Sequence, residues 1–222
     1  MKHWLRTNRG FLLFVLCFGI FRTAIADWNP IPSGSMRPTI LEGDVVFVNR
    51  LAYDLKLPLT DVSLVKLGEP RRGDIVTFSS PTDGTRLIKR VVALPGDVVS
   101  MRDEVLSVNG EYADYADLQT AVEPVAPGVT VHALRATETS QGHRRSVQFL
   151  EGAGARHSFD PLTVPAGHYF VLGDNRDNSA DSRYIGFVPR ERLIARAERV
   201  LVSADITDHW QPRLQRFLAS LY

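Results

Sequence analysis

Hydrophobic and polar residues follow a strand-like pattern over most of the chain. Short β-branched runs, each bounded by Gly, Pro or Asp, predict strands at residues 44–48, 74–78, 87–92, 97–101, 105–108, 168–172 and 197–202. Asn109-Gly110, directly after the fifth run, predicts a tight hairpin turn. Helical segments of about 10–15 residues do not alternate with these runs, which argues against a doubly wound α/β sheet. The chain is therefore predicted to be mainly β, with antiparallel sheets.

The N-terminal segment has a different pattern. The apolar residues 11–21 follow three basic residues: Lys2, Arg6 and Arg9. This order predicts a cytoplasmic N-terminus, with everything after the apolar run exported. The run is shorter than the roughly 20 residues that span a bilayer, and Ala24-Ile25-Ala26 matches the A-x-A pattern of a leader cleavage site. Because Arg22 can reach the outer interface and lengthen the span, the segment fits a cleavable leader and a retained anchor equally well.

Two later regions depart from the strand pattern. Between residues 107 and 167 the apolar periodicity weakens, and recurring Pro and Gly predict a smaller β subdomain or a large insertion with mobile loops. In the tail, apolar residues share one helical face: Trp210, Leu214, Phe217, Leu218 and Leu221. Residues 204–222 are therefore predicted to form a helix that packs on the core or lies on a membrane surface.

Composition narrows the function. Lys+Arg is 26 against Asp+Glu 25, so the clustered basic excess of a nucleic-acid-binding protein is absent. The single cysteine, Cys17, excludes an intrachain disulfide and a multi-cysteine metal site. The sequence contains no G-x-S-x-G, H-E-x-x-H, P-loop or dinucleotide motif. Asp177-x-Ser179-x-Asp181 resembles the start of a calcium loop but lacks its later glycine and glutamate. No nucleic acid, metal or cofactor is expected.

Three segments carry candidate chemistry. Residues 31–39, Ile-Pro-Ser-Gly-Ser-Met-Arg-Pro-Thr, hold two serines on a loop that proline stiffens. Residues 86–97 place Lys89 and Arg90 on opposite faces of an apolar strand, so at least one cation lies among apolar side chains. A desolvated lysine can act as a base near neutral pH. Residues 173–184 form a polar loop after an apolar strand. Taken singly, the segments also fit a turn, an edge-strand lysine and a solvated loop.

In this order the segments resemble the type I signal peptidase family, bacterial leader peptidases that are serine proteases with a Ser/Lys dyad. The family's boxes P-S-G-S-M-x-P-T, G-D-[IV]-V-x-F, [IV]-K-R-V-x-x-L-P-G-D and G-D-N-R-x-x-S-x-D-S-R match residues 32–39, 73–78, 88–97 and 173–183. The resemblance covers most of residues 28–107 and 168–190. It implies a membrane-bound endopeptidase that removes N-terminal signal peptides from exported precursors and cuts after small residues of the A-x-A type.

The resemblance also implies roles for individual residues. Ser35 resembles the nucleophile and Lys89 the general base, while Ser33 resembles the hydroxyl that joins the Ser35 backbone N–H in the oxyanion hole. The residues alone do not distinguish Ser35 from Ser33. Ser179 resembles the hydroxyl that orients the lysine amine. Asp181, Arg183 and Arg90 resemble the other supporting residues of the site. Six residues match positions that line shallow pockets for small substrate side chains: Ile31, Pro32, Met36, Ile40, Leu87 and Ile88.

The implied architecture is an antiparallel-sheet catalytic core with a smaller inserted β subdomain, preceded by one N-terminal transmembrane helix. Its parts are a cytoplasmic N-terminus (1–9), an anchor (10–26), the core (27–106 and 168–203), the insertion (107–167) and a C-terminal helix (204–222). The resemblance favours a retained single-pass anchor in the cytoplasmic (inner) membrane, with the core on the outer, periplasmic face. Signal peptides and membrane lipid are the expected partners. Two alternatives stay open: a pilin-maturation peptidase of the same Ser/Lys superfamily, and an inactive membrane-tethered binding domain.

Overall fold

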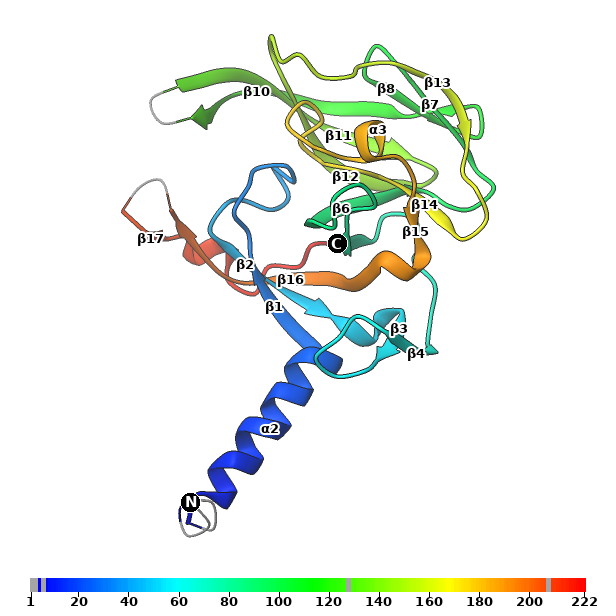
Figure 1. Cartoon of the computed structure of the whole chain (residues 1–222). Helices are drawn as coiled ribbons and strands as arrows, with labels where there is room; N and C mark the ends of the chain where they lie inside the picture. The colour runs from blue at the N-terminus through cyan, green and yellow to red at the C-terminus, as the bar shows by residue number, and fades with distance from the viewer. Residues whose placement is uncertain (1–3, 5–6, 127–128, 207–208) are drawn as a thin grey trace.

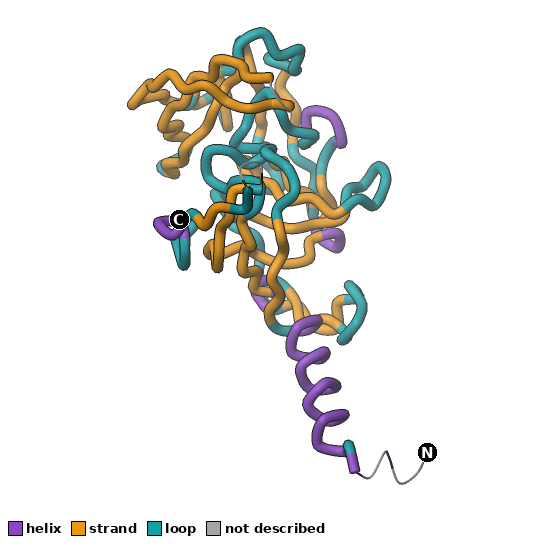
Figure 2. The backbone as a smooth tube through the Cα atoms, turned by 90° about the vertical axis from the view of Figure 1, so that its left-hand side faces the viewer, coloured by secondary structure: helices purple, strands orange, loops and turns teal. Residues whose placement is uncertain are grey.

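The N-terminal helix projects from a β-rich body in the computed structural model, which describes residues 4, 7–126, 129–206 and 209–222. Helix α2 (Arg9–Ala24) forms a stalk that leads directly into strand β1 (Ala26–Pro30), as Figures 1 and 2 show from two sides. At its base, Arg22 Nε lies 2.8 Å from Asp27 Oδ1. Among the residues that the structure describes, no helix has both the length and the apolar character needed to cross a membrane.

The largest sheet forms the centre of the body. Its strands lie in the order β1, β2 (Asp44–Asn49), β16 (Leu193–Asp205), β5 (Ile75–Ser79), β6 (Arg86–Ala93), β14 (His168–Leu172) and β15 (Val188–Pro189), and β17 (Gln211–Pro212) pairs with β16. Each pair of neighbouring strands in this sheet is antiparallel. The prediction of a mainly β chain built from antiparallel sheets is therefore confirmed.

Three smaller sheets flank the central one. They comprise β13 (Phe159–Thr163) with β7 (Val98–Arg102), β8 (Val105–Val108) and β9 (Glu111–Tyr112); β10 (Asp114–Ala126) with β11 (Val129–Ser140) and β12 (His143–Leu150); and β3 (Asp54–Lys56) with β4 (Ser63–Lys66). Between β8 and β9, Asn109 and Gly110 have φ of 55° and 81°, the left-handed values that the predicted hairpin turn requires. The described part of residues 107–167 is thus mostly β-structure.

Alternation along β6 distributes its side chains among three buried apolar clusters. Ile88 packs against the cluster that contains Met36 and Ile40, whereas Leu87 and Val91 belong to a cluster on the opposite side of the strand. Both cations of the strand are buried, Lys89 at 2% exposure and Arg90 at 4%. Both cations are thus removed from water, and Arg90 is neutralised by an ion pair with Asp174.

The predicted C-terminal helix is wrong. Within residues 204–222, the described part forms strand β17 and one 3-10 turn, η3 (Leu214–Arg216). Arg216 Nη2 lies 2.6 Å from Asp44 Oδ2, and Arg213 Nη1 donates to the Glu42 carbonyl at 2.9 Å. These contacts with the start of β2 hold the tail extended along the sheet. Trp210 and Leu214, which lie on the predicted apolar face, are 70% and 69% exposed, whereas Leu221 is buried in the core, so the predicted residues do not form one packed face.

Candidate active site

Ser35 lies on the loop that joins β1 to β2. The loop is closed at its ends by backbone hydrogen bonds from Ile31 N to Asp44 O (2.9 Å) and from Gly43 N to Ile31 O (3.0 Å). Met36 and Ile40 anchor it from below, because both side chains are fully buried in the core. Ser35 itself is only 9% exposed. The apolar residues of the loop thus fix the backbone that carries the serine.

Lys89 reaches this serine from the neighbouring strand β6. Its Nζ lies 2.7 Å from Ser35 Oγ and 2.9 Å from the Ile88 carbonyl oxygen. Burial lowers the pKa of Lys89 to about 8, although the negative charges of Asp181 and Asp174 oppose that shift. An amine with this pKa is partly unprotonated near neutral pH, so it can accept a proton from the serine hydroxyl.

The loop after β14 packs directly against the serine loop. A Cβ placed on Gly173 would lie 2.5 Å from the Ser35 carbonyl oxygen and 2.2 Å from Ser179 Oγ, so only glycine permits this close approach. Asn175 then donates twice, from its backbone N to Ser35 O at 3.2 Å and from Nδ2 to Gly34 O at 3.0 Å. These contacts fix the distance between the two loops.

The structure brings the predicted supporting residues into the same region. Asp181 accepts hydrogen bonds from Gly173 N at 3.0 Å and from Arg183 Nε at 2.9 Å, and the Asp181–Arg183 pair is buried. Ser179 Oγ is buried and makes no hydrogen bond to any residue that the structure describes. Ser33 has an exposed side chain two positions before Ser35.

Comparisons with known proteins identify the family. A family model described as signal peptidase, peptidase S26, matches residues 2–202. The chain is 36% identical over 208 residues to signal peptidase I of Pseudomonas aeruginosa, covering 86% of this chain and 69% of that protein. It is 35% identical over 214 residues to signal peptidase I of Rickettsia prowazekii, with coverages of 89% and 80%. This chain belongs to the signal peptidase family, peptidase S26.

Membership confirms the predicted enzyme class, a signal peptidase I hydrolase that removes signal peptides from precursor proteins. A crystal structure of a signal peptidase I from Enterococcus faecalis is 35% identical, covers 58% of this chain and 97% of that chain, and has a TM-score of 0.35.

The residues expected to contact substrate do not all lie together. Ile31, Met36 and Ile40 share one buried cluster, and Ile88 packs against its edge. Leu87 packs instead against the cluster on the other side of β6. The last member of the set, Pro32, has an exposed side chain on the serine loop.

Sequence reasoning gave no role to Asp174, which organises much of the site in this signal peptidase. Its carboxylate accepts two hydrogen bonds from Arg90, at 2.9 Å and 2.7 Å, and one from Thr39 Oγ1 at 2.5 Å. Asp174 therefore joins β6, the serine loop and the loop after β14. One sequence feature could have indicated this role: Asp174 follows the apolar strand β14 after a single glycine. A carboxylate there can neutralise the buried Arg90.

A second missed group ties the loop after β14 to the sheet β10–β11–β12. Glu138 of β11 ion-pairs with Arg145 of β12 and with Arg176 of the loop, and all three side chains are buried. Although burial alone would raise it, the charges of Arg176 and Arg145 lower the pKa of Glu138 to about 2. Polar residues at strand positions predict a solvated face, so their burial was not anticipated.

Proposed function

We propose that Ser35 is the nucleophile and Lys89 the general base of a Ser/Lys mechanism that cleaves signal peptides. The unprotonated amine takes the hydroxyl proton while Ser35 Oγ attacks the scissile carbonyl carbon. Lys89 then returns that proton to the leaving amine, and water hydrolyses the acyl-enzyme ester by the same base. The observation that carries this proposal is the 2.7 Å contact between Lys89 Nζ and Ser35 Oγ in a buried setting.

The oxyanion that develops on the substrate needs hydrogen-bond donors. In this proposal they are the Ser35 backbone N–H and the Ser33 hydroxyl, which lie two residues apart on one loop. The exposed Ser33 side chain is free to rotate toward a bound carbonyl. In this proposal Ser179 orients the lysine amine once substrate binds: its buried hydroxyl makes no hydrogen bond to any described residue, Lys89 included, and lies against Gly173 beside the serine loop. The Asp181–Arg183 and Arg90–Asp174 pairs support the site from below.

The proposed cleavage specificity rests on the apolar cluster beside the serine. Ile88, at the edge of this cluster, would form a shallow wall that accepts small side chains one and three residues before the cut, backed by the buried Ile31, Met36 and Ile40. Their dense packing leaves room for alanine more readily than for a large side chain. Leu87 packs against a different cluster, but it lies two positions before Lys89 and therefore on the same face of β6 as the proposed base.

We further propose that α2 is a retained anchor in the cytoplasmic membrane, with the catalytic region on the outer face. Cleavage after Ala26 would have to cut inside β1, where Ala26 pairs with Asn49 and Asp27 with Val48. A peptide bond within a paired strand is poorly accessible to a peptidase. This pairing therefore supports retention over removal of the N-terminal segment.

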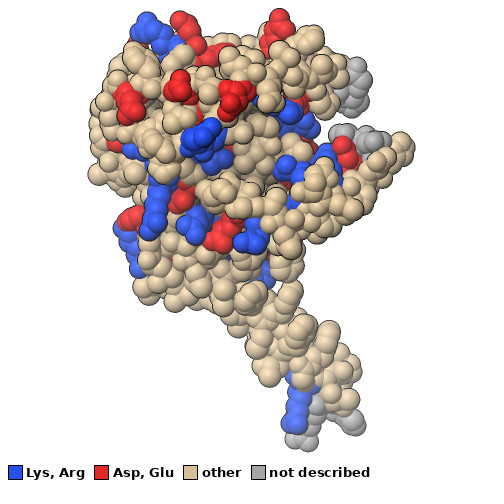
Figure 3. All heavy atoms as spheres, turned by 180° about the vertical axis from the view of Figure 1, so that it is seen from behind, with Lys and Arg blue, Asp and Glu red and all other residues tan. Residues whose placement is uncertain are grey.

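Exposed apolar side chains near the stalk support contact with lipid. The hairpin β3–β4 lies beside the C-terminal end of α2 (Figures 1 and 2), and it exposes seven large apolar residues: Leu55, Leu57, Leu59, Val62, Leu64, Val65 and Leu67. The stalk shows few charged side chains along its length in the view of Figure 3. A contiguous apolar surface of this kind is typical of a membrane or protein contact.

Cleavage of a purified secretory precursor tests the mechanism. We expect Ser35→Ala and Lys89→Ala each to abolish product formation while the circular dichroism spectrum stays that of the wild type. Ser33→Ala is the matched comparison, because the loss of one oxyanion donor lowers the rate about 10²–10³-fold without removing the nucleophile. Near-normal cleavage by Ser35→Ala or Lys89→Ala would reject the dyad.

The same assay separates the alternatives. A dedicated pilin-maturation peptidase would leave the generic precursor intact and process only its own substrate. An inactive binding domain would process neither one. Cleavage of the generic precursor by the wild type, lost in both alanine variants, is the result that the proposed function requires.

A further inference from the structure

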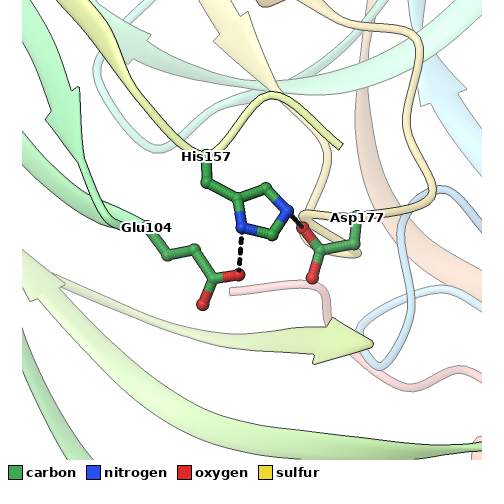
Figure 4. A group of neighbouring side chains, drawn as sticks. All are labelled: Glu104, His157 and Asp177. Carbon is green, nitrogen blue, oxygen red and sulfur yellow. Dashed lines mark ion pairs between the residues drawn. The ribbon is translucent and has the colours of Figure 1, made fainter. Parts of the chain in front are cut away.

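A histidine, His157, lies between two carboxylates, one of which belongs to the loop after β14. His157, from the segment that precedes β13, has Nδ1 3.1 Å from Glu104 Oε1 and Nε2 3.6 Å from Asp177 Oδ1 (Figure 4). Glu104 comes from the turn between β7 and β8, and Asp177 from the loop after β14. Three segments far apart in the sequence therefore meet at one imidazole ring.

The backbone holds this arrangement in place. Glu104 N donates to the His157 carbonyl oxygen at 2.8 Å, so these two residues are fixed to each other by more than their side chains. Asp177 is anchored separately, because its Oδ2 accepts a hydrogen bond from Leu150 N at 2.8 Å. That bond leaves Oδ1 as the carboxylate oxygen that faces the ring.

The two atoms that face each other lack a hydrogen bond. His157 Nε2 and Asp177 Oδ1 are both buried and make none to any described residue, and their separation of 3.6 Å is too long for one. The Asp177 side chain is 1% exposed. A neutral imidazole that donates from Nδ1 to Glu104 turns the Nε2 lone pair toward this buried carboxylate oxygen. Such a pairing is unfavourable unless Nε2 carries a proton or a metal cation lies between the two atoms, and their separation of 3.6 Å is too long for a hydrogen bond.

The geometry points to a metal. We propose that His157 Nε2 and Asp177 Oδ1 bind a divalent transition-metal ion of the zinc type, and that Glu104 orients the imidazole by accepting the Nδ1 proton. A zinc ion lies about 2.0–2.1 Å from nitrogen and oxygen ligands, so two neighbouring ligands in a tetrahedron are roughly 3.4 Å apart. The observed 3.6 Å is close to that spacing. A carboxylate bonded to the far nitrogen is the usual partner of a metal-bound histidine.

Two cavities adjoin the proposed ligands, and water in them would complete the coordination of the ion. Glu104 and His157 line a cavity together with His132 and Glu151, and Asp177 lines a neighbouring cavity with Glu151. Nitrogen ligation favours zinc and its neighbours in the transition series over magnesium or calcium, which prefer oxygen.

Bound metal would act on the loop that carries the site. Asp177 lies two residues after Asn175, whose side chain and backbone hold the serine loop, and two residues before Ser179. Fixing Asp177 to His157 would tie that loop to the β7–β8 turn. We therefore expect zinc to stabilise the folded chain, since a ligand that binds only the folded state raises its stability.

Isothermal titration of the full chain in detergent, after treatment with a chelator, tests the proposal. We expect one Zn²⁺ per chain and no detectable binding of Mg²⁺. His157→Gln and Asp177→Asn should each weaken Zn²⁺ binding at least tenfold, and Glu104→Gln about 10–100-fold, as loss of the carboxylate behind a ligating histidine does. His168→Gln is the matched control, because His168 lies outside the cluster at the start of β14 and should bind Zn²⁺ like the wild type.

Thermal melting supplies the second measurement. Zn²⁺ should raise the melting temperature of the wild type and of His168→Gln, but not that of His157→Gln. Each variant is first melted without metal, and if Asp177→Asn unfolds, His157→Gln decides alone, since its ring is 38% exposed and its loss leaves the core intact. Zn²⁺ affinity unchanged in His157→Gln would mean adventitious binding and would overturn the proposal. Absence of binding to the wild type would overturn it equally, whatever the outcome for peptidase activity.

Discussion

Among the residues that the structure describes, two lysines are buried, Lys56 and Lys89, and they differ in what the amine contacts. Lys56 on β3 is 1% exposed and Lys89 on β6 is 2% exposed, and burial lowers the pKa of both. The Lys56 amine donates to the Leu193 carbonyl oxygen. The Lys89 amine lies 2.7 Å from Ser35 Oγ. Burial thus lowers the pKa of both amines, but the two amines contact different groups, a carbonyl oxygen and a hydroxyl.

This difference shows that a lowered pKa does not by itself make a catalytic base. A carbonyl oxygen has no proton to give, so Lys56 can only serve as a donor there. A hydroxyl can donate as well as accept, so the neutral amine of Lys89 can take the Ser35 hydroxyl proton. Its removal turns Ser35 Oγ into a nucleophile. The neighbouring acids do not make this distinction, because an arginine pairs with Asp54 near Lys56 and with Asp181 near Lys89 alike.

The largest expected effect on cleavage comes from replacing each lysine by methionine, which keeps roughly the length of the side chain and removes its amino group. We expect Lys89→Met to lower kcat/KM for precursor cleavage at least about 10³-fold, as the loss of a catalytic base does. Lys56→Met should stay within about threefold of the wild type, because a buried charge replaced by an apolar group is often tolerated. Equal losses in the two variants would end the distinction between the regions.

The contrast between the two lysines also shows which features of the site can be predicted from the sequence. The boundaries of β2, β5 and β6 were predicted closely, because Gly, Pro and Asp mark where each apolar run stops. Alternation along β6 predicted that at least one of its two cations is buried, and the structure buries both. The contact with Ser35 bridges 54 positions, and no local pattern encodes such a pairing. It was expected only from the resemblance of the boxes to a known family.

Other features depended wholly on distant partners. Lys56 is buried because it meets Leu193, which is 137 residues away. The tail shows helical periodicity, yet Arg216 binds Asp44 across 172 positions and keeps it extended. Glu138 occupies a polar stretch that reads as a solvated strand, yet Arg145 and Arg176 enclose it. Buried ion pairs are set by tertiary contact, so sequence patterns of apolar residues do not reveal them.

An intermediate effect is expected from pH. Because the folded-state pKa of Lys89 is about 8, the unprotonated fraction rises about 50-fold between pH 6 and pH 8. The value of kcat/KM for precursor cleavage should rise by a similar factor over that range and level off above it. Lys56→Met should show the same profile as the wild type, since its amine takes no part. A flat profile in the wild type would mean that the titrating amine is not the base.

The smallest expected effect is on stability, and here the two lysines should behave alike. The pKa of Lys89 is about 8 in the folded chain against 10.5 for a free lysine, so between these values the unfolded chain binds more protons. The free energy of unfolding of the wild type, relative to Lys89→Met, should therefore increase with pH across this window, by roughly 1 kcal/mol per pH unit. Below pH 8 the difference should be constant, because the amine is charged in both states.

Urea unfolding of the wild type and both methionine variants at several pH values from 7 to 10 measures this effect. The wild type should also gain stability relative to Lys56→Met as the pH rises, since burial lowers the pKa of Lys56 as well. Both lysines would then show the free-energy cost of burying an ammonium group. Only the protonation of Lys89 would also change the rate of precursor cleavage. If the wild type instead lost stability relative to either variant as the pH rose, the folded chain would hold the proton of that amine more tightly than the unfolded chain, and its pKa would be raised by folding, which burial does not do.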